Sequence, residues 1–211
     1  MLFRSLAEGY QRRTTLFPGW HELLVARTET GPGDTVVDVG CGPGLNFAAL
    51  QTAVGPTGTI IGIEESPELL SVAAHQVARR GWDNVQLIHA PPGTVDLPVF
   101  ADAALFSATP EVLGSAPAVA NILAQLRPGA GVATGGWKLP SRWLWPLRIC
   151  VNTLRASYPG HATGFDEPWR LLAEDLSDVT VSTLGFGTGY LAHTHTRPPP
   201  RGRHRAPRGP G

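Results

Sequence analysis

The stretch Val36-Val37-Asp38-Val39-Gly40-Cys41-Gly42-Pro43-Gly44 decides the fold of this chain, which has 211 residues. Its valines are β-branched and suit a buried parallel strand, and the glycines that follow let the backbone turn tightly. Residues 45–54 then predict a helix, whose first N–H groups have no partner inside the helix and point toward the turn. The stretch therefore predicts a strand, a glycine turn and a helix, with a turn that favours a polar or anionic group.

A second acidic residue, Glu64, ends the next predicted strand at Ile60-Ile61-Gly62-Ile63-Glu64. A carboxylate in this place can accept two hydrogen bonds from the neighbouring hydroxyls of a ribose, as in NAD-binding and S-adenosylmethionine-binding folds. The dinucleotide pattern G-x-G-x-x-G would need a third glycine at position 45, where this chain has Leu45. The glycine spacing therefore disfavours an NAD-dependent oxidoreductase.

The segment from Asp38 to Gly44 resembles the first motif of the class I S-adenosylmethionine-dependent methyltransferases, and Glu64 matches the ribose-binding acid of that family. The resemblance continues through residues 67–81, 84–88 and 124–131, and covers roughly residues 10–135. It extends to small methyltransferases related to the ubiquinone/menaquinone biosynthesis enzymes and to bacterial phosphatidylethanolamine N-methyltransferases.

This resemblance implies S-adenosyl-L-methionine as the cofactor and a set of residues that hold it. Backbone of the glycine turn would line the methionine part, Asp38 would receive its ammonium group, and Glu64 would bind the ribose. An aromatic residue from an N-terminal segment would lie close to the cofactor, although Tyr10 suits simple core filling equally well. The implied cofactor-binding residues are Asp38, Gly40, Cys41, Gly42, Gly44, Glu64, Tyr10 and Ser107.

Strands and helices alternate along the chain in the order expected of a doubly wound parallel sheet. The clearest helix is bounded by Ser66 as its cap, Pro67 in its first turn and Gly81 after its end. A glycine-rich turn at 185–189 predicts a final antiparallel hairpin. Strands are predicted at 35–39, 59–63, 84–89, 101–106, 130–135, 179–183 and 190–194, and helices at 45–54, 67–80 and 116–126.

The fold class is thus α/β: a Rossmann-like, doubly wound, mostly parallel seven-stranded sheet with a C-terminal antiparallel hairpin. Length and composition predict one methyltransferase domain over residues 1–196. We expect residues 1–28 to form a helical cover, with a second short helix starting near Pro18, and residues 137–165 to form a cap insertion. Residues 197–211 predict a disordered basic tail of proline, glycine and arginine, because no large apolar side chain occurs there.

The charge of the chain disfavours one class of partner, and its cysteine content indicates a compartment. The chain has 17 basic and 17 acidic residues, and five of the arginines lie in the tail, so the body has 12 basic against 17 acidic residues. A body of that sign does not favour nucleic acid. Two cysteines are too few for a disulfide scaffold, and neither a signal peptide nor a long apolar stretch occurs, which predicts a cytoplasmic protein.

The segment at 137–149 combines Trp137, Trp143 and Trp145 with Lys138, Arg142 and Arg148. Aromatic rings with flanking cations suit a lid over an apolar acceptor or a transient dock at a membrane surface. Ordinary packing of a cap helix explains the same composition equally well, so the residues leave the three roles open.

The chemistry implied by the resemblance is in-line displacement at a sulfonium methyl group, which needs positioning but no protein nucleophile. The fourth strand is followed by Leu105-Phe106-Ser107-Ala108-Thr109-Pro110 instead of an N-P-P-Y sequence, which argues against methylation of nucleobase or protein amides. The expected acceptor is therefore a small molecule, a secondary metabolite or a lipid-like compound, methylated on a hydroxyl, an amine or an activated carbon.

Two features of the sequence, one histidine and the segment after the third strand, bear on this hypothesis. For a hydroxyl acceptor a base would help, and His161 is the candidate, with an exposed loop histidine as the alternative. Relatives commonly carry an adenine-binding acid after the third strand, where this chain has His89-Ala90-Pro91-Pro92-Gly93. That departure supports the alternative of a degenerate fold that binds cofactor or a partner without turnover. The histidines do not form a metal-like cluster with a nearby carboxylate in the sequence, so we predict that the protein binds no metal.

Overall fold

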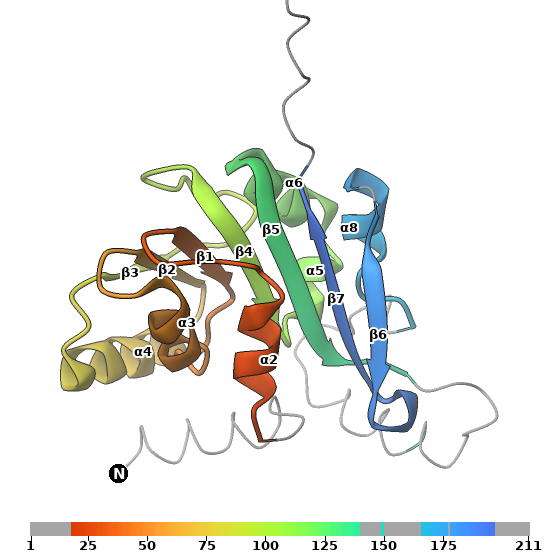
Figure 1. Cartoon of the computed structure of the whole chain (residues 1–211), viewed down its shortest axis with the longest axis horizontal. Coiled ribbons are helices and arrows are strands. Elements are labelled where there is room, and N and C mark those ends of the chain that lie inside the picture. The colour runs from red at the N-terminus through yellow and green to blue at the C-terminus, as the bar shows by residue number, and fades with distance from the viewer. Residues whose placement is uncertain (1–17, 140–148, 150–165, 177, 197–211) are drawn as a thin grey trace, which may run out of the picture.

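Seven strands form one sheet in the order β3-β2-β1-β4-β5-β7-β6, as the computed structural model shows for the residues it describes, 18–139, 149, 166–176 and 178–196 (Figure 1). The first five strands pair in parallel, and β7 pairs antiparallel with both β5 and β6. The strands are β1 (Thr35–Val39), β2 (Thr59–Glu64), β3 (Val85–His89), β4 (Ala101–Ser107), β5 (Leu126–Trp137), β6 (Thr180–Leu184) and β7 (Gly189–His195). This topology confirms the predicted fold class.

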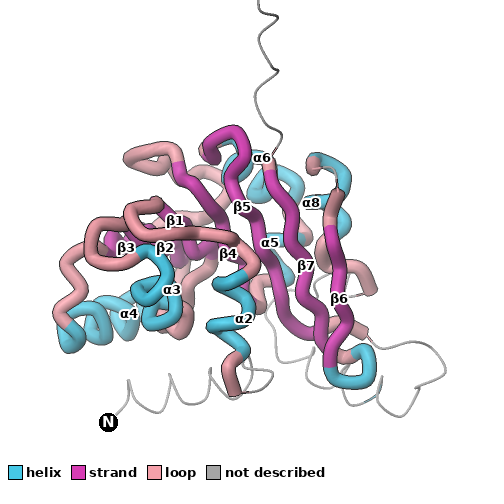
Figure 2. Tube along the Cα trace, viewed as in Figure 1, coloured by secondary structure: helices cyan, strands magenta, loops and turns pink. Residues whose placement is uncertain are grey.

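Helices cover both faces of the sheet (Figures 1 and 2). They are α2 (Trp20–Ala26), α3 (Phe47–Val54), α4 (Pro67–Arg80), α5 (Pro110–Leu113), α6 (Ala116–Ala124) and α8 (Arg170–Asp175), with a short 3-10 turn η2 (Gly185–Gly187) inside the hairpin. The packed side chains place α2, α3 and α4 on one face and α5, α6 and α8 on the other.

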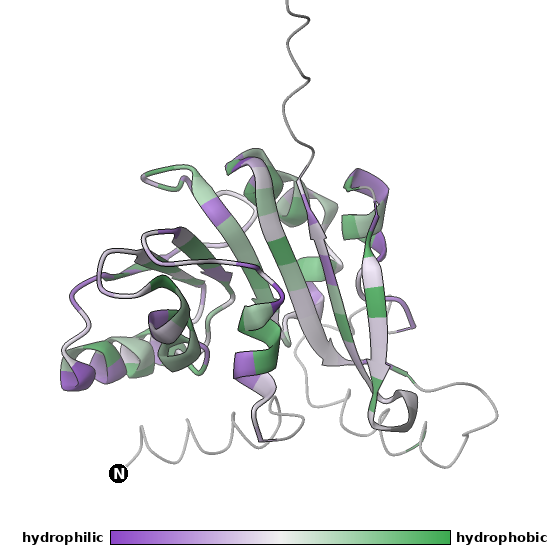
Figure 3. Ribbon diagram, viewed as in Figure 1, coloured by the Kyte–Doolittle hydropathy of each residue, from purple (hydrophilic) through white to green (hydrophobic). Residues whose placement is uncertain are grey.

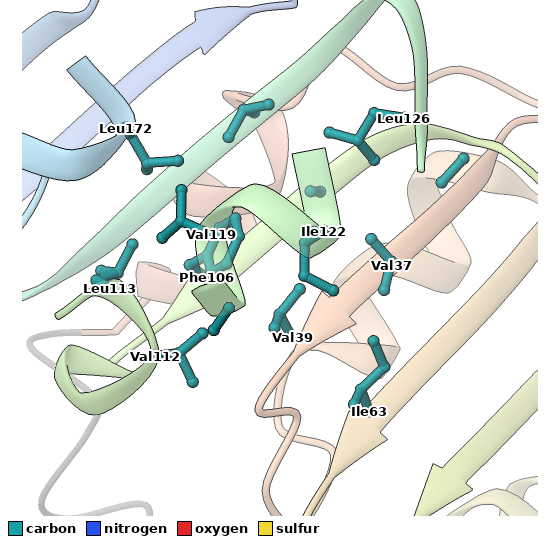
Figure 4. Close-up of a cluster of buried hydrophobic side chains, with 14 of the residues drawn as sticks. Val37, Val39, Ile63, Phe106, Val112, Leu113, Val119, Ile122, Leu126 and Leu172 are labelled. Atoms are coloured by element: carbon teal, nitrogen blue, oxygen red, sulfur yellow. The ribbon is translucent and has the colours of Figure 1, made fainter. Parts of the chain in front are cut away.

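Alternation along the strands divides the core between these two faces. In β1, Val36 packs with Trp20 and Phe47, whereas the next residue, Val37, faces the opposite helices. Figure 4 shows this second cluster, in which Phe106 lies among aliphatic side chains from the strands, α5 and α6. The central strands are buried on both sides, which explains their nearly continuous apolar sequences.

Local sequence sets the bounds of α4 as predicted. The hydroxyl of Ser66 accepts a hydrogen bond from the backbone N–H of Leu69 at 3.3 Å, and Pro67 occupies the first turn. Gly81 ends the helix in the left-handed region at φ 64°. In Figure 3 the C-terminal end of α4 is hydrophilic, in keeping with its last residues, Arg79 and Arg80.

Several predicted boundaries were wrong. Helix α3 begins at Phe47 instead of residue 45, and α6 ends at Ala124 because β5 begins almost at once, at Leu126. Strand β5 runs from Leu126 to Trp137 instead of 130–135, and its register with β4 shifts between Ala101 and Ala103. Helices α5 and α8 were not predicted; four and six residues are too few to show a helical period.

Some predictions lie partly or wholly outside the described residues. The second helix of the N-terminal cover is confirmed as α2, but residues 1–17 lie outside the described part. The same holds for most of the cap insertion and for the basic tail at 197–211. The domain limits and the disorder of the tail therefore stay predictions.

Helix α2 packs against β5 at Gly135, which has no side chain. A Cβ atom placed on Gly135 would lie 2.6 Å from Cη2 of Trp20 and 3.1 Å from Cδ1 of Leu24. Both of these side chains are fully buried. The absence of a side chain at position 135 therefore lets α2 lie directly against the sheet.

We expect Gly135→Ala to lower the free energy of unfolding by about 1–3 kcal/mol, because the added methyl group overpacks the ring of Trp20. Gly93→Ala is the matched control, since a Cβ there would meet its nearest atom at an ordinary 3.7 Å. Urea denaturation of both variants measures the difference. Equal stability of the two variants would show that α2 can shift to accommodate the methyl group.

Candidate functional site

The candidate site lies where β1, β2 and β4 end. Strand β1 has β2 on one side and β4 on the other. From β1 the chain first adds strands on the β2 side and then crosses over to add β4 on the opposite side, so β1 and β4 flank the point where the strand order reverses. Ligands of open parallel sheets bind at the carboxyl ends of the strands, at such a switch point. Backbone pairing places Val39 of β1 opposite Ile63 of β2 and Phe106 of β4, so the residues after each strand come together.

The glycine turn that follows β1 has a backbone that other residues rarely adopt. Gly40, Gly42 and Gly44 have φ values of 67°, 55° and 83°. A Cβ atom on Gly40 would lie 2.5 Å from Cγ2 of Thr109, so the turn is also closely packed against the segment after β4. The positive φ values favour glycine at all three positions, and at Gly40 the close packing requires it as well.

Glu64 connects the end of β2 to this turn. Its Oε2 accepts a hydrogen bond from the backbone N–H of Gly42 at 2.9 Å, and its Oε1 accepts one from the backbone N–H of Ser66 at 2.8 Å. The residue is 7% exposed. Each carboxylate oxygen can accept a further hydrogen bond, so the group is oriented by the protein and still able to bind ribose hydroxyls.

Asp38 is fully buried at the base of the turn. Nδ2 of Asn46 donates to Oδ1 and Oδ2 of Asp38, each at 3.1 Å. Burial raises the pKa of Asp38 from 3.8 to about 7, the Asn46 hydrogen bonds oppose this rise, and the nearby charge of Glu64 adds to it. A carboxyl group in this state is stabilised by any cation that comes next to it.

Cys41 contributes its backbone, and its side chain belongs to the core. Its N–H donates to the carbonyl oxygen of Ile63 at 2.9 Å, which extends the β1–β2 pairing by one residue. Its Sγ lies 3.0 Å from the position of a Cβ on Gly62. Burial, followed by the charges of Asp38 and Glu64, raises the pKa of the thiol, so the sulfur stays protonated and is not a nucleophile.

The end of β4 forms the opposite wall of the site. Ser107 is nearly buried, and the next residue, Ala108, has a positive φ of 54° that is unusual for alanine. The N–H of Ala108 donates to the carbonyl oxygen of Gly135 at 2.8 Å, which holds this backbone. Thr109 follows and packs its methyl group toward Gly40. Such local strain is often found at functional sites.

The ends of β1, β2 and β4 bring Asp38, Glu64, Ser107 and the glycines of the turn to the same edge of the sheet. That these residues bind the cofactor stays a prediction. Tyr10 and His161 lie outside the described residues. Sequence reasoning missed Asn46 and His21, whose Nδ1 lies 2.7 Å from Oδ1 of Asn46. A signal for Asn46 was present, because it is an amide two residues after Gly44 at the start of a mostly apolar helical segment.

After β3 this chain has Pro91 where the resemblance implies an adenine-binding acid. Nε2 of His89 lies 3.0 Å from the carbonyl oxygen of Glu65. The segment that follows turns away along α6, where Nδ2 of Asn121 donates to the carbonyl oxygens of Pro92 and Val95 at 2.9 and 2.8 Å. Pro91 supplies neither a carboxylate nor an N–H to a base.

Within the described ranges, histidine, cysteine and acidic side chains do not gather into a group of three or more that could hold a metal ion. None of the helices that the structure describes is long and apolar enough to cross a membrane.

The residues present fit S-adenosylmethionine. The buried carboxyl group of Asp38 suits an ammonium group, and the remaining lone pairs of Glu64 suit vicinal hydroxyls. The glycine turn between them has positive φ values at Gly40, Gly42 and Gly44, a backbone conformation that glycine adopts readily. The fold and the site together define an S-adenosylmethionine-binding protein of the class I methyltransferase type.

Comparison with known proteins agrees. The model of the family described as protein-L-isoaspartate(D-aspartate) O-methyltransferase matches residues 11–131, more than half of the chain, and the chain belongs to this family of S-adenosylmethionine-dependent methyltransferases. S-adenosylmethionine is therefore its cofactor.

Relatives and solved structures extend this result. The chain is 35% identical over 188 residues to trans-aconitate 2-methyltransferase of Azoarcus sp. (strain BH72), covering 79% of this chain and 72% of that protein. It is 32% identical over 93 residues to demethylmenaquinone methyltransferase of Geobacillus kaustophilus, covering 42% and 40%. A SAM-dependent methyltransferase from Aquifex aeolicus shares the fold, with a TM-score of 0.65, 20% identity, and 92% and 96% coverage.

The extent of these matches is uneven. The chain spans 34% to 43% of the length of several of the bacterial proteins that it matches. The family model ends at residue 131, within β5, so the shared part is mainly the half of the sheet that carries the glycine turn and Glu64.

The raised pKa of Asp38 predicts how stability depends on pH without a ligand. The folded-state pKa of about 7 lies above the ordinary value of 3.8, so the folded state holds this proton more tightly than the unfolded state. The resulting stabilisation is complete below about pH 4 and is lost as pH rises through about 7. We expect wild type to lose about 2–4 kcal/mol more than Asp38→Asn between pH 4 and pH 8. Urea denaturation at both pH values measures this, and equal losses would contradict the prediction.

Proposed function

We propose that this chain is a methyltransferase that moves the methyl group of S-adenosylmethionine to a hydroxyl, an amine or an activated carbon of a small-molecule, secondary-metabolite or lipid-like acceptor. The single observation that carries the proposal is the pair of buried carboxyl groups, Asp38 and Glu64, on either side of the glycine turn. These two groups suit the ammonium and ribose ends of one cofactor.

When bound, the cofactor supplies a sulfonium methyl group that a nucleophile can displace. The protein has to orient the cofactor and the acceptor and to exclude water. Glu64 and the glycine turn hold the cofactor, and Ser107 and Thr109 at the end of β4 line the acceptor side. Orientation of this kind can contribute about 7–11 kcal/mol to lowering the barrier. For a hydroxyl acceptor, His161 is the candidate base.

The names of the relatives indicate which acceptors to test. One relative is named for trans-aconitate, another for demethylmenaquinone, and the family model for isoaspartate in proteins. Two of these are acids, and a carboxylate needs no base to become a nucleophile. The test panel should therefore contain a tricarboxylic acid, a quinol and an isoaspartyl peptide, together with a metabolite extract.

We expect S-adenosylhomocysteine to bind, and to stabilise the protein by about 2.7 kcal/mol at a hundredfold excess over its Kd. Transfer of a labelled methyl group to a member of the panel is the second readout. Glu64→Ala should abolish both, whereas Glu65→Ala, next to it and exposed, controls for a general change in stability at this turn.

Two outcomes separate the alternatives. No binding of S-adenosylhomocysteine at millimolar concentration, by isothermal titration, would contradict the proposal. Binding without transfer to any acceptor would support a degenerate fold that binds cofactor or a partner without turnover. The absence of an acid at Pro91 is the observation that favours this second candidate.

The proposed partners are an acceptor of this kind and no nucleic acid, in a cytoplasmic setting. A transient contact with membrane surfaces is a further proposal, suggested by the tryptophan-rich segment. At the start of that segment, Nζ of Lys138 lies 5.6 Å from the ring centroid of Trp169, which in turn lies 5.1 Å from the ring of Tyr190. This cation is therefore engaged by the fold itself.

Sedimentation with anionic phosphatidylserine-containing vesicles tests the membrane contact. We expect wild type to co-sediment at low salt, with less binding after removal of residues 197–211 and after the double substitution Trp143→Ser and Trp145→Ser. Screening by salt should weaken the part due to the arginines. If both variants sediment like wild type, neither segment is a membrane dock.

A further inference from the structure

A chain of hydrogen bonds runs from the cofactor side of β1 to helix α2. Nδ2 of Asn46 donates to both carboxyl oxygens of Asp38 at 3.1 Å, and Oδ1 of Asn46 lies 2.7 Å from Nδ1 of His21. Asp38 and Asn46 are buried, with exposed fractions of 0% and 3%. The chain thus joins three separate elements: β1, the turn before α3, and α2.

The donors and acceptors in this chain have a defined direction. An ionised carboxylate can only accept hydrogen bonds, so the amide nitrogen of Asn46 must face Asp38. The amide oxygen of Asn46 then faces His21, and the imidazole must donate from Nδ1. Rotation of the amide by half a turn would put its oxygen against the carboxylate, and the bond to His21 opposes that rotation.

The position of Asn46 supports a role in the site. Asn46 is the N-cap residue of α3, and asparagine is among the preferred residues there because its side chain can accept from a free N–H of the helix. In this structure its side chain makes no cap hydrogen bond. Its hydrogen bonds go to Asp38 and His21 instead, which a purely helix-capping role does not require.

We propose that His21 is a positioning residue of the cofactor site: through Asn46 it holds the Asp38 carboxylate ready for the ammonium group of S-adenosylmethionine. The inference rests on the proposed function and deepens it. Because His21 is in the first turn of α2, which Trp20 anchors against Gly135, binding of the methionine end of the cofactor depends on the docking of α2.

The electrostatic surroundings explain why orientation matters. Asp38 faces Glu64 across the turn, and both this charge and burial favour its protonated form, whereas the Asn46 hydrogen bonds favour the ionised form. The thiol of Cys41 stays neutral, because burial and the charges of Asp38 and Glu64 raise its pKa. Loss of the correct Asn46 orientation leaves no described neutral donor to favour the ionised carboxyl group, so a cation is received less well.

Isothermal titration of His21→Leu with two probes tests the proposal. S-adenosylhomocysteine carries the amino-acid end, whereas 5′-methylthioadenosine has the adenosine and sulfur without it. We expect His21→Leu to weaken S-adenosylhomocysteine binding about tenfold at pH 7, which is about 1.4 kcal/mol, and to leave 5′-methylthioadenosine binding within twofold. His21→Gln should restore most of the affinity, because its amide can donate to Asn46.

The pH profile gives a readout that a merely structural role would not change. Affinity of wild type for S-adenosylhomocysteine should rise with pH between 5.5 and 7.5, as Asp38 loses its proton. In His21→Leu the midpoint of this rise should move to higher pH, and in His21→Gln it should return toward the wild-type value.

Several results would overturn the proposal. Unchanged S-adenosylhomocysteine affinity in His21→Leu, or an equal loss for both probes, would show that His21 does not act on the amino-acid end. If the variant does not fold, 15N NMR of the wild-type imidazole at alkaline pH decides: a proton on Nδ1 is expected, and a proton on Nε2 would refute the arrangement. Failure of wild type to bind either probe would instead refute the proposed function.

Discussion

The structure of the site depends on a carboxyl group buried at the tip of the central strand. Taking an ionised carboxylate out of water without a partner costs several kcal/mol, so the fold has to surround Asp38 with donors or leave it protonated. Asn46 donates two hydrogen bonds to Asp38, which lower its pKa. The effect of burial is larger, so the pKa of Asp38 is raised to about 7. A cation beside Asp38 would favour the ionised carboxyl group.

Parallel strand pairing delivers the other groups to the same place. The register that sets Val39 against Ile63 continues through the N–H of Cys41, so Glu64 arrives beside the turn and accepts from Gly42. On the other side, pairing of β1 with β4 brings the segment after Ser107 against Gly40. The site is therefore a consequence of strand order and register, with little contribution from long loops.

The family model matches the part of the chain that carries the glycine turn and Glu64, whereas the acceptors named for the relatives differ. The family model covers the chain to residue 131, which includes the glycine turn, Glu64 and the first part of β5. The names of the relatives refer to acceptors as different as trans-aconitate and demethylmenaquinone. One cofactor half combined with variable acceptor-binding parts is the usual way in which one fold serves many substrates.

Much of this protein could be predicted from local sequence. The valines of β1, the glycines of the turn, and the capping residues Ser66 and Gly81 each act through their own backbone conformation or an adjacent hydrogen bond, so they were readable without a structure. Short helices such as α5 and the irregular start of β5 were not, because packing rather than periodicity defines them.

The tertiary structure decided which side chains meet. Asp38 and Glu64 were predicted from sequence as cofactor-binding residues, but Asn46, which donates to Asp38, and His21, which contacts Asn46, were not. His21 and Asn46 are 25 positions apart and touch only because Trp20 docks α2 against the glycine-lined face of β5. Sequence determined the backbone of the site, since that is local chemistry; the hydrogen-bond chain behind it required the packing of separate elements.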